Sequence, residues 1–555
     1  MVQIYCKNSG TSKSFVAGTP LSEVVNEFEF DKPYDIISAR VNNVSQGLKF
    51  KVYNNRDVEF IDARDCSGMR VYTRSLTFLL CKAAADVIPG RMYIEHPIAN
   101  GIYCNFKKNS KEPLSDEDVA LIKSRMREIV NKDMPFRRHE VQIEEAIRSF
   151  QQRGYEDKVK LLETSSEVYI DYYSLGDSVD YFYGPLVPSA GYLKVWDLHR
   201  YQDGLLLSLP SVEKPDEVAP FIDQPKTFDV FREYTRWEII MGLTNAGDVN
   251  RAIDKGAASE LIQVAEALQE KKIVKIAEEI QSRYENQENP LRVVLINGPS
   301  SSGKTTFCKR LSVQLKACGL RPLSISTDDY FVNRVDTPLL PNGKYDFDNF
   351  ETVDHAALQN DVLKLLKGQA VEVPEYNFKT GIREYNGKKL SLGKGSILLV
   401  EGIHALNPNL IPEVPESSLF KIFINTLTSI SLDNHNCVPT SDNRLLRRIV
   451  RDYNNGSFSA EASISQWKDV CDAERQWILP YQERADVMFN SAYLIEFAVL
   501  RNHAELILAS IQKSRPEYTE AHRLLKFLHY FRPVSDKQVP PTSLLREFLG
   551  GSSFQ

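Results

Sequence analysis

The segment 298–305, with the sequence Gly-Pro-Ser-Ser-Ser-Gly-Lys-Thr, constrains the fold of this chain more than any other. It fits the pattern G-x-x-x-x-G-K-[ST] at every fixed position. An apolar run at 291–296 leads into it, and a helical pattern at 306–317 follows. In the order strand, glycine-rich loop and helix, backbone amides and a helix N-terminus converge on phosphate oxygens. The sequence therefore predicts a site for the phosphates of ATP or GTP, and it leaves the choice between them open.

The composition is that of a globular chain with several domains. Its 555 residues exceed what one hydrophobic core supports, so about three or four domains are expected. Apolar residues make up 42% and charged residues 26%, which argues against a disordered chain or a membrane protein. The net charge of -6 gives no global electrostatic footprint for nucleic acid, so any RNA binding has to be local.

The start of the chain and its cysteines favour a cytoplasmic location. The first ten residues, MVQIYCKNSG, lack a charged and then apolar secretory pattern, and no apolar window of about 18 residues could span a bilayer. The eight cysteines form no C-x-x-C pair, which argues against a disulfide framework or a structural zinc site. We therefore expect reduced thiols in a cytoplasmic protein without membrane contact.

Hydrophobic patterns divide the chain into five segments. Short β-like runs and one helical stretch predict a small β-grasp-like unit, and an α+β segment and a helical connector follow it. Next, strand-like runs alternate with helical stretches, which predicts an α/β domain with a parallel sheet. A helical tail closes the chain and is expected to pack back on that domain. The segments in order are 1–62, 63–225, 226–286, 287–512 and 513–555.

Two helix starts are marked by candidate capping residues. Thr19 precedes the helical stretch of the first segment, and Ser115 precedes a long amphipathic helix in the second. A third helix is predicted between about Ala257 and Asn286, where apolar residues recur at helical spacing before the pattern breaks.

Residues around the phosphate site have the chemistry of phosphoryl transfer. Lys304 can bridge the terminal phosphates, and the Thr305 hydroxyl can ligate magnesium. Asp328 follows the next predicted strand, where a carboxylate beside the loop can accept a proton from an attacking hydroxyl. The alternative is that Asp328 and Asp329 cap a turn. The residues expected to bind ATP are Gly298, Ser300, Ser301, Ser302, Gly303, Lys304, Thr305 and Thr306.

Four further motifs follow in order along the same segment. They are Tyr345-Asp-Phe-Asp348, Val373-Pro-Glu-Tyr376-Asn-Phe with Arg383, Leu399-Val-Glu401-Gly402, and Arg444-Leu-Leu-Arg447-Arg448-Ile-Val-Arg451. Together with the glycine-rich loop they resemble the uridine kinase and phosphoribulokinase family of P-loop kinases, over roughly residues 290 to 500. The resemblance implies a magnesium-dependent ATP phosphotransferase that acts on the primary hydroxyl of a nucleoside or a similar small metabolite.

The resemblance also implies roles for individual residues. Asp328 is the base that activates the acceptor hydroxyl, and Asp348 falls where the family holds ribose hydroxyls. Tyr376 and Arg383 fall where it lines the acceptor pocket. Glu401 occupies the acidic position near magnesium, which it would contact through water. Four arginines on a predicted helix suit a lid that neutralises transferring phosphate: Arg444 and Arg447 as catalytic groups, and Arg448 and Arg451 as substrate-binding groups.

Departures from the family pattern leave the acceptor open. Gly381 stands where uridine kinases carry a histidine that contacts the base, and Asn349 replaces another histidine of the pattern. The segment after Asp452 also lacks the arginines usual in the lid. One alternative is a kinase for a non-nucleoside small molecule. A second is a regulator that senses RNA or nucleotides, with the P-loop domain as a switch.

Residues 1 to about 210 are similar to the amino-terminal half of threonyl-tRNA synthetase, which has a TGS domain and then an editing-type domain. The similarity lies in Ala17-Gly-Thr19-Pro, Ala39-Arg-Val-Asn42, Leu114-Ser-Asp-Glu-Asp118 and Tyr183-Gly-Pro-Leu-Val-Pro-Ser-Ala-Gly191-Tyr. The metal-binding or hydrolytic positions of that family's editing site correspond here to Arg74, Phe78, Phe182 and Leu186. All four are changed, so neither hydrolytic editing nor zinc binding is expected.

The amino-terminal half is therefore expected to act as a scaffold or a sensor. Direct RNA binding is the less favoured alternative, for which four arginines would supply local positive charge. They are Arg64, Arg70, Arg74 and Arg91. The sequence also leaves the oligomeric state open, a homo-oligomer included.

Overall fold

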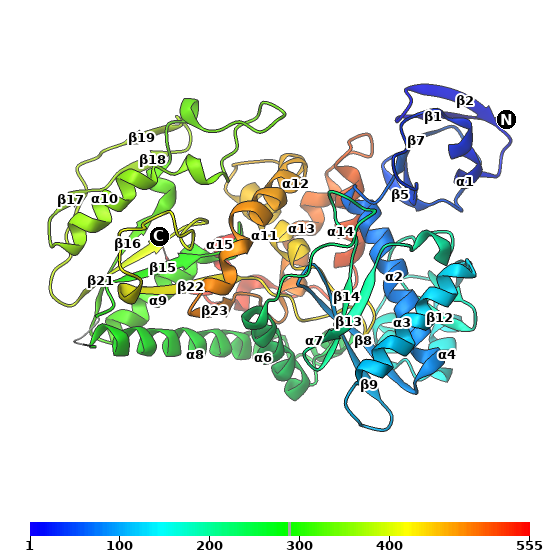
Figure 1. The fold of residues 1–555 in the computed structure, drawn as a ribbon, viewed down its shortest axis with the longest axis horizontal. Coiled ribbons are helices and arrows are strands. Elements are labelled where there is room, and N and C mark those ends of the chain that lie inside the picture. Colours follow the sequence, from blue (N-terminus) through cyan, green and yellow to red (C-terminus); the bar gives the residue numbers. More distant parts are fainter. Residues whose placement is uncertain (287–289, 555) are drawn as a thin grey trace.

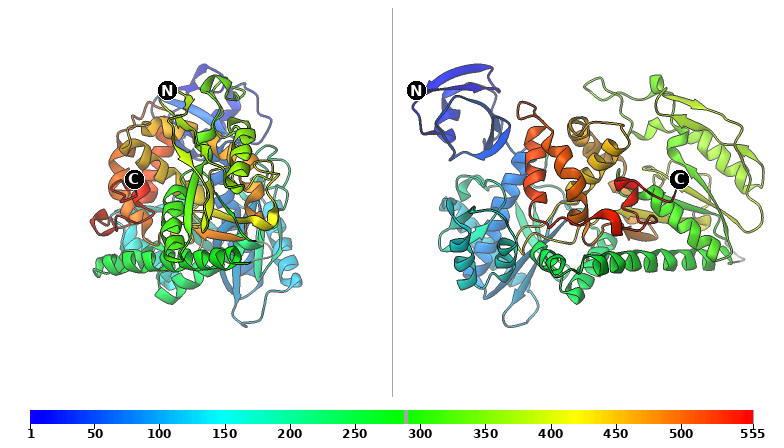
Figure 2. Two further views of the ribbon diagram at one scale, coloured as in Figure 1. Left: turned by 90° about the vertical axis from the view of Figure 1, so that its left-hand side faces the viewer. Right: turned by 180° about the vertical axis from the view of Figure 1, so that it is seen from behind.

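The computed structural model describes residues 1–286 and 290–554 (Figure 1). The amino-terminal half lies on the right of Figure 1, and the α/β part that follows lies on the left. Helices from the last part of the chain lie between them, as the rear view of Figure 2 also shows. Residues near the end of the chain therefore lie between the two halves.

The first segment folds around a five-stranded sheet. Its strand order is β2-β1-β7-β4-β5; β1 and β7 run parallel and the other neighbours run antiparallel. The short helix α1 (Leu21–Val24) supplies two buried side chains to the core of this sheet. The strands are β1 (Val2–Cys6), β2 (Thr11–Phe15), β4 (Ser38–Val41), β5 (Val44–Gly47) and β7 (Arg56–Ile61), with a small pair β3 (Thr19–Pro20) and β6 (Lys51–Val52).

Thr19 does not cap α1, contrary to the sequence-based expectation. It lies in β3, and its hydroxyl donates to the carbonyl of Val16 at 2.8 Å. Pro20 occupies the N-cap position, and within the described residues no side chain caps the helix. The chain enters the helix directly from strand β3, so the Thr19 hydroxyl bonds to Val16 before the helix begins.

The second segment combines two antiparallel sheets with helices. The larger sheet has the order β13-β14-β9-β8, and the smaller one has the order β10-β11-β12. Ser115 caps α3 as expected, in a capping box with Asp118. The elements are α2 (Cys66–Val87), β8 (Gly90–Ile98), β9 (Gly101–Lys108), α3 (Asp116–Asn131), β10 (Arg137–Gln142), α4 (Ile143–Gln152), α5 (Glu156–Glu163), β11 (Tyr169–Leu175), β12 (Ser178–Tyr181), β13 (Asp197–Tyr201) and β14 (Gly204–Ser208).

Three helices connect this segment to the α/β part: α6 (Pro225–Met241), α7 (Ala246–Asp254) and α8 (Ala258–Tyr284). The long helix α8 is the one that the apolar spacing predicted, and it runs along the lower edge of the α/β part in Figure 1. Its isoleucines share a buried cluster with the central sheet and with α9 (Lys304–Ala317), the helix after the glycine-rich loop. Arg310 of α9 also pairs with Glu270 of α8 at 2.5 Å. The connector is therefore packed as part of the α/β core.

The α/β part is built on a fully parallel five-stranded sheet, as the alternating pattern predicted. Its order is β16-β21-β15-β22-β23. The sheet strands are β15 (Val293–Asn297), β16 (Arg321–Ser326), β21 (Ser396–Glu401), β22 (Leu419–Asn425) and β23 (Val487–Asn490). Around them lie α10 (His355–Leu366), α11 (Thr440–Asn454) and α12 (Ala460–Trp477). The hairpin of β18 (Glu375–Asn377) and β19 (Ile382–Glu384) is flanked in sequence by the paired strands β17 (Val371–Glu372) and β20 (Lys389–Leu390).

The carboxy-terminal helices tie the two halves together. They are α13 (Glu496–Ala509), α14 (Tyr518–Leu528) and the short α15 (Arg546–Leu549). One buried apolar cluster contains Phe150 and Tyr181 of the amino-terminal half together with Phe497 of α13 and Phe527 of α14. The tail returns to the α/β part, where Leu544 joins the cluster around α9, so the expected packing of the tail is confirmed. Among the described helices, none has the length and apolar character needed to cross a membrane.

Candidate active site in the P-loop domain

The glycine-rich loop adopts a conformation that few side chains allow. Ser301 and Gly303 have positive φ angles of 58° and 88°. A Cβ atom on Gly298 would lie 2.2 Å from the carbonyl oxygen of Ile424, so the close approach of β15 to β22 requires glycine at that position. The hydroxyls of Ser301 and Ser302 are buried, and no partner for them lies in the described part of the chain. Orphaned buried donors around such a loop fit the phosphates of a nucleotide.

The first residues of α9 carry the groups that contact phosphate in this motif. Lys304 opens the helix, and its Nζ donates to the carbonyl of Pro299 at 3.1 Å, folded back over the loop. Thr305 follows, and its hydroxyl donates to Oε1 of Glu401 at 3.5 Å. The loop therefore lies directly beside the carboxyl end of β21.

The positive charge of Lys304 acts on two acidic side chains at the carboxyl edge of the sheet. Glu401 ends β21, and Asp328 follows the neighbouring strand β16. The pKa of Glu401 is raised to about 7, chiefly by burial and then by the charge of Asp328, while Lys304 opposes the rise. Burial likewise raises the pKa of Asp328 against the opposing effect of Lys304. Two buried carboxylates served by one lysine have a deficit of positive charge, which fits a bound cation.

A tight contact holds these two strand ends together. A Cβ on Gly402 would lie 1.7 Å from the hydroxyl oxygen of Thr327, so no residue other than glycine fits after Glu401. Asp329, next to Asp328, points elsewhere: its Oδ1 accepts from the backbone amide of Tyr376 at 3.5 Å. The two neighbouring aspartates therefore serve different parts of the site.

Helix α11 presents its arginines to the glycine-rich loop. Arg444 donates to the carbonyl of Ser300 at 3.2 Å, and Arg448 lies 3.5 Å from the hydroxyl of the same serine. Arg447 is fully buried and donates to the carbonyl of Ser301 at 3.4 Å. Arg451 contacts Asp452 at 2.8 Å instead. The structure thus brings three of the four predicted lid arginines to the loop.

Protein carboxylates already neutralise the two innermost arginines. Glu474 of α12 pairs with Arg444, with 2.6 Å between Nη2 and Oε2. Glu496 of α13 pairs with Arg447, with 2.8 Å between Nη2 and Oε2. Because both ion pairs are buried, the arginines are held against the back of the loop and keep it in shape.

Two carboxylates also accept hydrogen bonds from amides in the region that a nucleotide would occupy. Oε1 of Glu474 accepts from the amide of Ser300 at 3.1 Å, and Oε2 of Glu547, in α15, accepts from the amide of Thr306 at 3.1 Å. The ring of Phe548 lies 4.8 Å from the guanidinium carbon of Arg447. Sequence reasoning missed Glu474 and Glu547 because they lie 174 and 241 residues from these amides, with no local pattern to connect them.

Asp348 lies close enough to Glu474 and Arg448 for their charges to act on its carboxyl group. Its pKa is raised to about 7, chiefly by desolvation and then by Glu474, while Arg448 opposes the rise. A second residue here, His404, was missed from the sequence, although it follows Glu401 by only three positions. It is buried, and burial lowers its pKa to about 4, so its ring is neutral and contacts Phe350 with 5.5 Å between centroids.

The predicted acceptor residues Tyr376 and Arg383 lie opposite each other in the β18–β19 hairpin. Tyr376 is buried, and its hydroxyl has no partner among the described residues. Arg383 donates to Asp354 at 2.9 Å. Gly381, in the hairpin turn, has a φ of 73°, and a Cβ there would lie 2.7 Å from Cβ of Arg334. This conformation therefore leaves no room for a side chain at position 381.

In the amino-terminal half, three of the four altered editing positions share one cavity. Arg74, Phe182 and Leu186 line it, and Phe78 packs behind Phe182 with 5.5 Å between ring centroids. Arg70 lines it as well, whereas Arg64 and Arg91 do not. Arg64 instead pairs with Asp62 at 2.7 Å, so the group of four arginines expected from the sequence is only half assembled.

Comparison with known proteins identifies the α/β part. Residues 293–494 match the model of the Phosphoribulokinase / Uridine kinase family. This part of the chain therefore has the P-loop kinase fold of that family, and the amino-terminal region is similar to threonine–tRNA ligases.

Two curated relatives and one solved structure illustrate these similarities. Threonine–tRNA ligase of Marinobacter nauticus is 29% identical over 34% of this chain and 30% of its own length, so the chain spans less than a third of that relative. Uridine kinase of Ureaplasma parvum is 26% identical over 36% of this chain and 88% of its own length. The structure of D-glycerate 3-kinase from Cryptococcus neoformans aligns with 47% of this chain and 87% of its own, at 14% identity and a TM-score of 0.22.

Proposed function

We propose that the segment 287–512 is an ATP-dependent kinase for a small molecule. The observation that carries the proposal is the convergence of Lys304, Asp328 and Glu401 at the carboxyl edge of the parallel sheet, directly beside the glycine-rich loop. Ligands of open α/β sheets bind at this edge. Phosphoryl transfer requires a phosphate cradle, a cation site and a base at one place, and these residues supply all three.

The acceptor hydroxyl would be activated by Asp328. Its carboxylate accepts the hydroxyl proton as the new O–P bond forms and the bond to the ADP oxygen breaks. The ammonium group of Lys304 stabilises the charge that spreads over the transferred phosphoryl group, and Arg448 can reach it from the side of Ser300. Because Arg444 and Arg447 are paired with Glu474 and Glu496, we assign them the positioning of the loop rather than direct contact with the phosphate.

Magnesium would be held by the hydroxyl of Thr305 and, through water, by Glu401. The short distance between these two groups and the raised pKa of Glu401 fit a divalent cation at this place. When bound, magnesium supplies neutralisation of the phosphate oxygens.

The acceptor proposed first is the primary hydroxyl of a nucleoside, held by Asp348 and lined by Tyr376 and Arg383. The position of Asp348 near Glu474, Arg448 and Asp328, whose charges act on its carboxyl group, supports a role in orienting the acceptor. A second candidate is a non-nucleoside hydroxyl compound. It is favoured by Gly381, since that turn presents no side chain to contact a base.

The test is turnover of magnesium-ATP by the full chain against a panel of nucleosides, sugars and polyols, with GTP in parallel. At least one acceptor should stimulate ADP release and become phosphorylated. Lys304→Ala should lower this rate by about a hundredfold or more, because it removes a cation from the transition state.

The matched control is Lys309→Ala, which changes a lysine on the same helix whose Nζ reaches only toward the tail, 3.4 Å from the carbonyl of Phe554. This variant should keep most of the rate. If ATP binds but no acceptor stimulates ADP release, the kinase proposal fails, and the alternative of a nucleotide-controlled regulator replaces it.

A further inference from the structure

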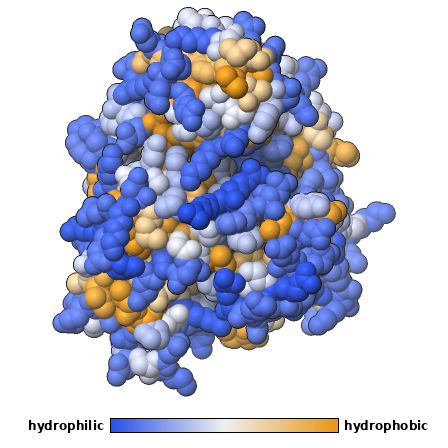
Figure 3. Space-filling view, turned by 90° about the vertical axis from the view of Figure 1, so that its right-hand side faces the viewer, coloured by the Kyte–Doolittle hydropathy of each residue, from blue (hydrophilic) through white to orange (hydrophobic). Residues whose placement is uncertain are grey.

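A cavity of about 660 Å³ lies where the amino-terminal half meets helix α14. Its walls come from the turn after β5 with Lys49, from α2 with Arg74, from β10 with Arg137, from the loop 182–188, and from α14 with Lys526. Its volume is within the range of small-molecule sites. Figure 3 shows the end of the molecule formed by this half, where hydrophilic residues predominate and hydrophobic ones are scattered.

Three of the arginines that line this cavity have acidic partners. Arg70 pairs with Glu520 at 2.7 Å, and Arg523 pairs with Asp442 at 2.6 Å. Arg138 pairs with Asp171 at 2.8 Å. These cations are therefore compensated by the protein itself.

Four other cations on the same walls have no such partner. No carboxylate in residues 1–286 or 290–554 lies within ion-pair distance of Lys49, Arg74, Arg137 or Lys526. Lys49 donates to the carbonyl of Phe136 at 2.7 Å, and Arg74 donates to the carbonyl of Pro185 at 3.1 Å. The Nε atom of Arg74 is buried without any partner in the described chain.

Burial and mutual repulsion act on these cations together. The pKa of Arg74 is lowered to about 10, chiefly by burial and in part by the charges of Arg70 and Arg523. Burial also lowers the pKa of Lys526, although Asp171 opposes the shift, and Arg74 contributes to the lowering. The pKa of Lys49 is lowered by burial and then by Arg137. A set of half-desolvated like charges costs free energy unless an anion joins it.

The cavity also has a partly exposed aromatic ring on its wall. This ring belongs to Tyr183, and its centroid lies 5.8 Å from the guanidinium carbon of Arg74; Phe136 and Phe182 also line the cavity but have only 2% of their surfaces exposed. Glycine at position 184 leaves space for the guanidinium group of Arg74, because a Cβ on Gly184 would lie 2.7 Å from Nη2 of Arg74. A ligand with several negative charges and one planar ring matches both kinds of wall.

We propose that this cavity binds a nucleoside di- or triphosphate, with its phosphates held by Lys49, Arg74, Arg137 and Lys526. The charge of such a ligand balances the four uncompensated cations, and its base can lie against the aromatic wall. Because α14 belongs to the end of the chain and packs against α13, an occupied cavity joins the amino-terminal half to the kinase part. This site is separate from the glycine-rich loop and does not depend on the proposed kinase activity.

The test is calorimetry on the full chain carrying Lys304→Ala, which weakens nucleotide binding at the glycine-rich loop. The probes are inorganic tripolyphosphate, ATP, GTP, CTP and UTP. At least one nucleotide should bind with one site per chain, more tightly than tripolyphosphate. Adding Arg74→Met or Lys526→Met should weaken this binding by about tenfold or more, because each removes a charge-assisted contact.

The matched control is Arg64→Met, which removes an arginine of the same segment that pairs with Asp62 outside the cavity. It should leave the affinity unchanged. Thermal melting of each variant without ligand shows whether it is folded, and a rise in melting temperature on adding nucleotide gives a second readout. The proposal is overturned if no probe binds, if binding ignores both methionine variants, or if an RNA hairpin with a single-stranded 3′ end binds at this site while the nucleotides do not.

Discussion

The glycine-rich loop and the cavity beside α14 both gather positive groups, but the protein treats these groups in opposite ways. At the loop, Glu474 and Glu547 accept hydrogen bonds from its amides, and Glu474 also neutralises Arg444. In the cavity, Arg74 and Lys526 have no carboxylate partner within the described residues. A nucleotide at the loop therefore competes with the protein's own carboxylates, whereas an anion in the cavity supplies charge that the protein lacks.

A third region of the protein holds a buried cation whose charge is fully compensated by carboxylates. Lys158 is completely buried between the halves, with its Nζ 2.6 Å from Asp180 and 2.9 Å from Asp433. Burial alone would lower its pKa, but the two aspartates raise it above the ordinary value. Cys81 and His435 complete this cluster around Asp180. Since an ammonium group already occupies the centre of the acidic pair, the cluster is a charge network rather than a free metal site.

The largest effect is expected from Lys158→Met. It leaves Asp180 and Asp433 buried without their cation and should destabilise the protein by about 3 to 5 kcal/mol. Urea unfolding measures this change. Lys160, two residues after Lys158, forms a partly exposed ion pair with Asp248. Lys160→Met should therefore lower the free energy of unfolding by less than about 1 kcal/mol. Equal losses in the two variants would contradict the picture of a buried, compensated charge.

The same network predicts a pH dependence of stability. Burial alone would lower the pKa of His435, but Asp180, with its Oδ2 2.6 Å away, raises it well above 6.5. The histidine's contribution is therefore complete below about pH 6.5 and is lost as the pH rises through its folded pKa. The unfolding free energy of the wild type should exceed that of His435→Gln most at pH 5 to 6, and the gap should shrink toward pH 9.

The counterpart at low pH comes from Asp180. His435 and Lys158 hold its pKa at about 2 in spite of its burial, so its contribution is present above about pH 4 and is lost as the pH falls toward 2. Lys158 and Asp433 also act on His435 in the same cluster. A gap between wild type and His435→Gln that stays constant from pH 5 to 9 would contradict the assigned ion pair.

A smaller effect is expected from Glu547→Gln at the glycine-rich loop. The change removes a negative charge that accepts from the amide of Thr306, so ATP should bind about three- to tenfold more tightly. Calorimetric titration with magnesium-ATP measures the shift. Glu505→Gln, a partly exposed glutamate of α13 that pairs with Arg501, should have no effect. Weaker ATP binding by Glu547→Gln would show that the carboxylate supports the loop and does not compete with phosphate.

The smallest effect is expected from Arg74→Met without ligand. Because this arginine is an uncompensated cation, losing its charge should leave the melting temperature unchanged or raise it by about 2 °C. A fall of several degrees would mean that the arginine is a structural tie, like Lys158. Lys158→Met and Arg74→Met together test directly whether Lys158 is compensated by carboxylates and Arg74 is not.

The sequence predicted those parts of the molecule that depend on short stretches of chain. The glycine-rich loop, Lys304 and the strand ends bearing Asp328 and Glu401 were all readable, because strand, loop and helix are adjacent in sequence. Ser115 was a correct cap for the same reason. Thr19 failed because its pairing with Val52, some thirty residues away, places it in strand β3, where its hydroxyl donates to Val16 and does not cap the helix.

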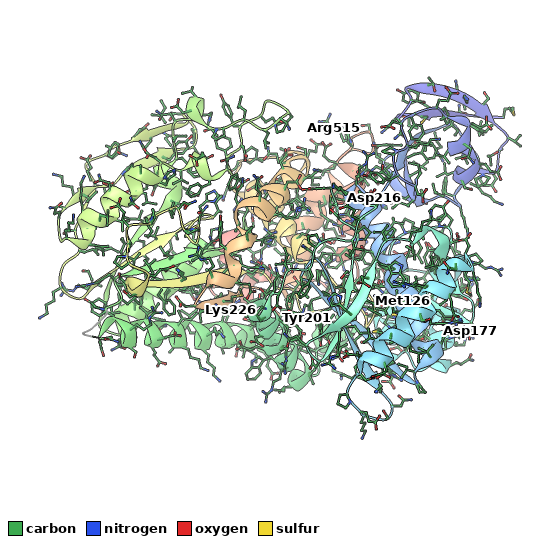
Figure 4. All side chains as sticks on the ribbon, viewed as in Figure 1. Met126, Asp177, Tyr201, Asp216, Lys226 and Arg515 are labelled. Carbon is green, nitrogen blue, oxygen red and sulfur yellow. The ribbon has the colours of Figure 1, made fainter. Side chains whose placement is uncertain are left out.

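What the sequence could not predict are the partners that folding brings in from far away. Glu474 and Glu547 reach the loop from helices near the end of the chain, and no spacing relates them to Ser300 or Thr306. The cavity shows the same limit. Arg70 and Arg74 were expected to supply positive charge, but the lysine that completes their site, Lys526, comes from α14. Figure 4 labels Arg515, which precedes this helix, at the upper edge of the molecule between the two halves. Arg515 pairs with Glu461 of α12 at 3.7 Å.

We propose that the carboxyl edge of the parallel sheet is a catalytic site with Asp328 as its base. The most direct measurement compares acceptor-dependent ADP release by Asp328→Asn and Asp329→Asn, with ATP binding measured in parallel. Asp328→Asn should lose about a hundredfold or more in rate and still bind ATP, while Asp329→Asn, whose side chain faces Tyr376, should lose only a fewfold. Equal rates in the two variants, or full activity in Asp328→Asn, would contradict the account.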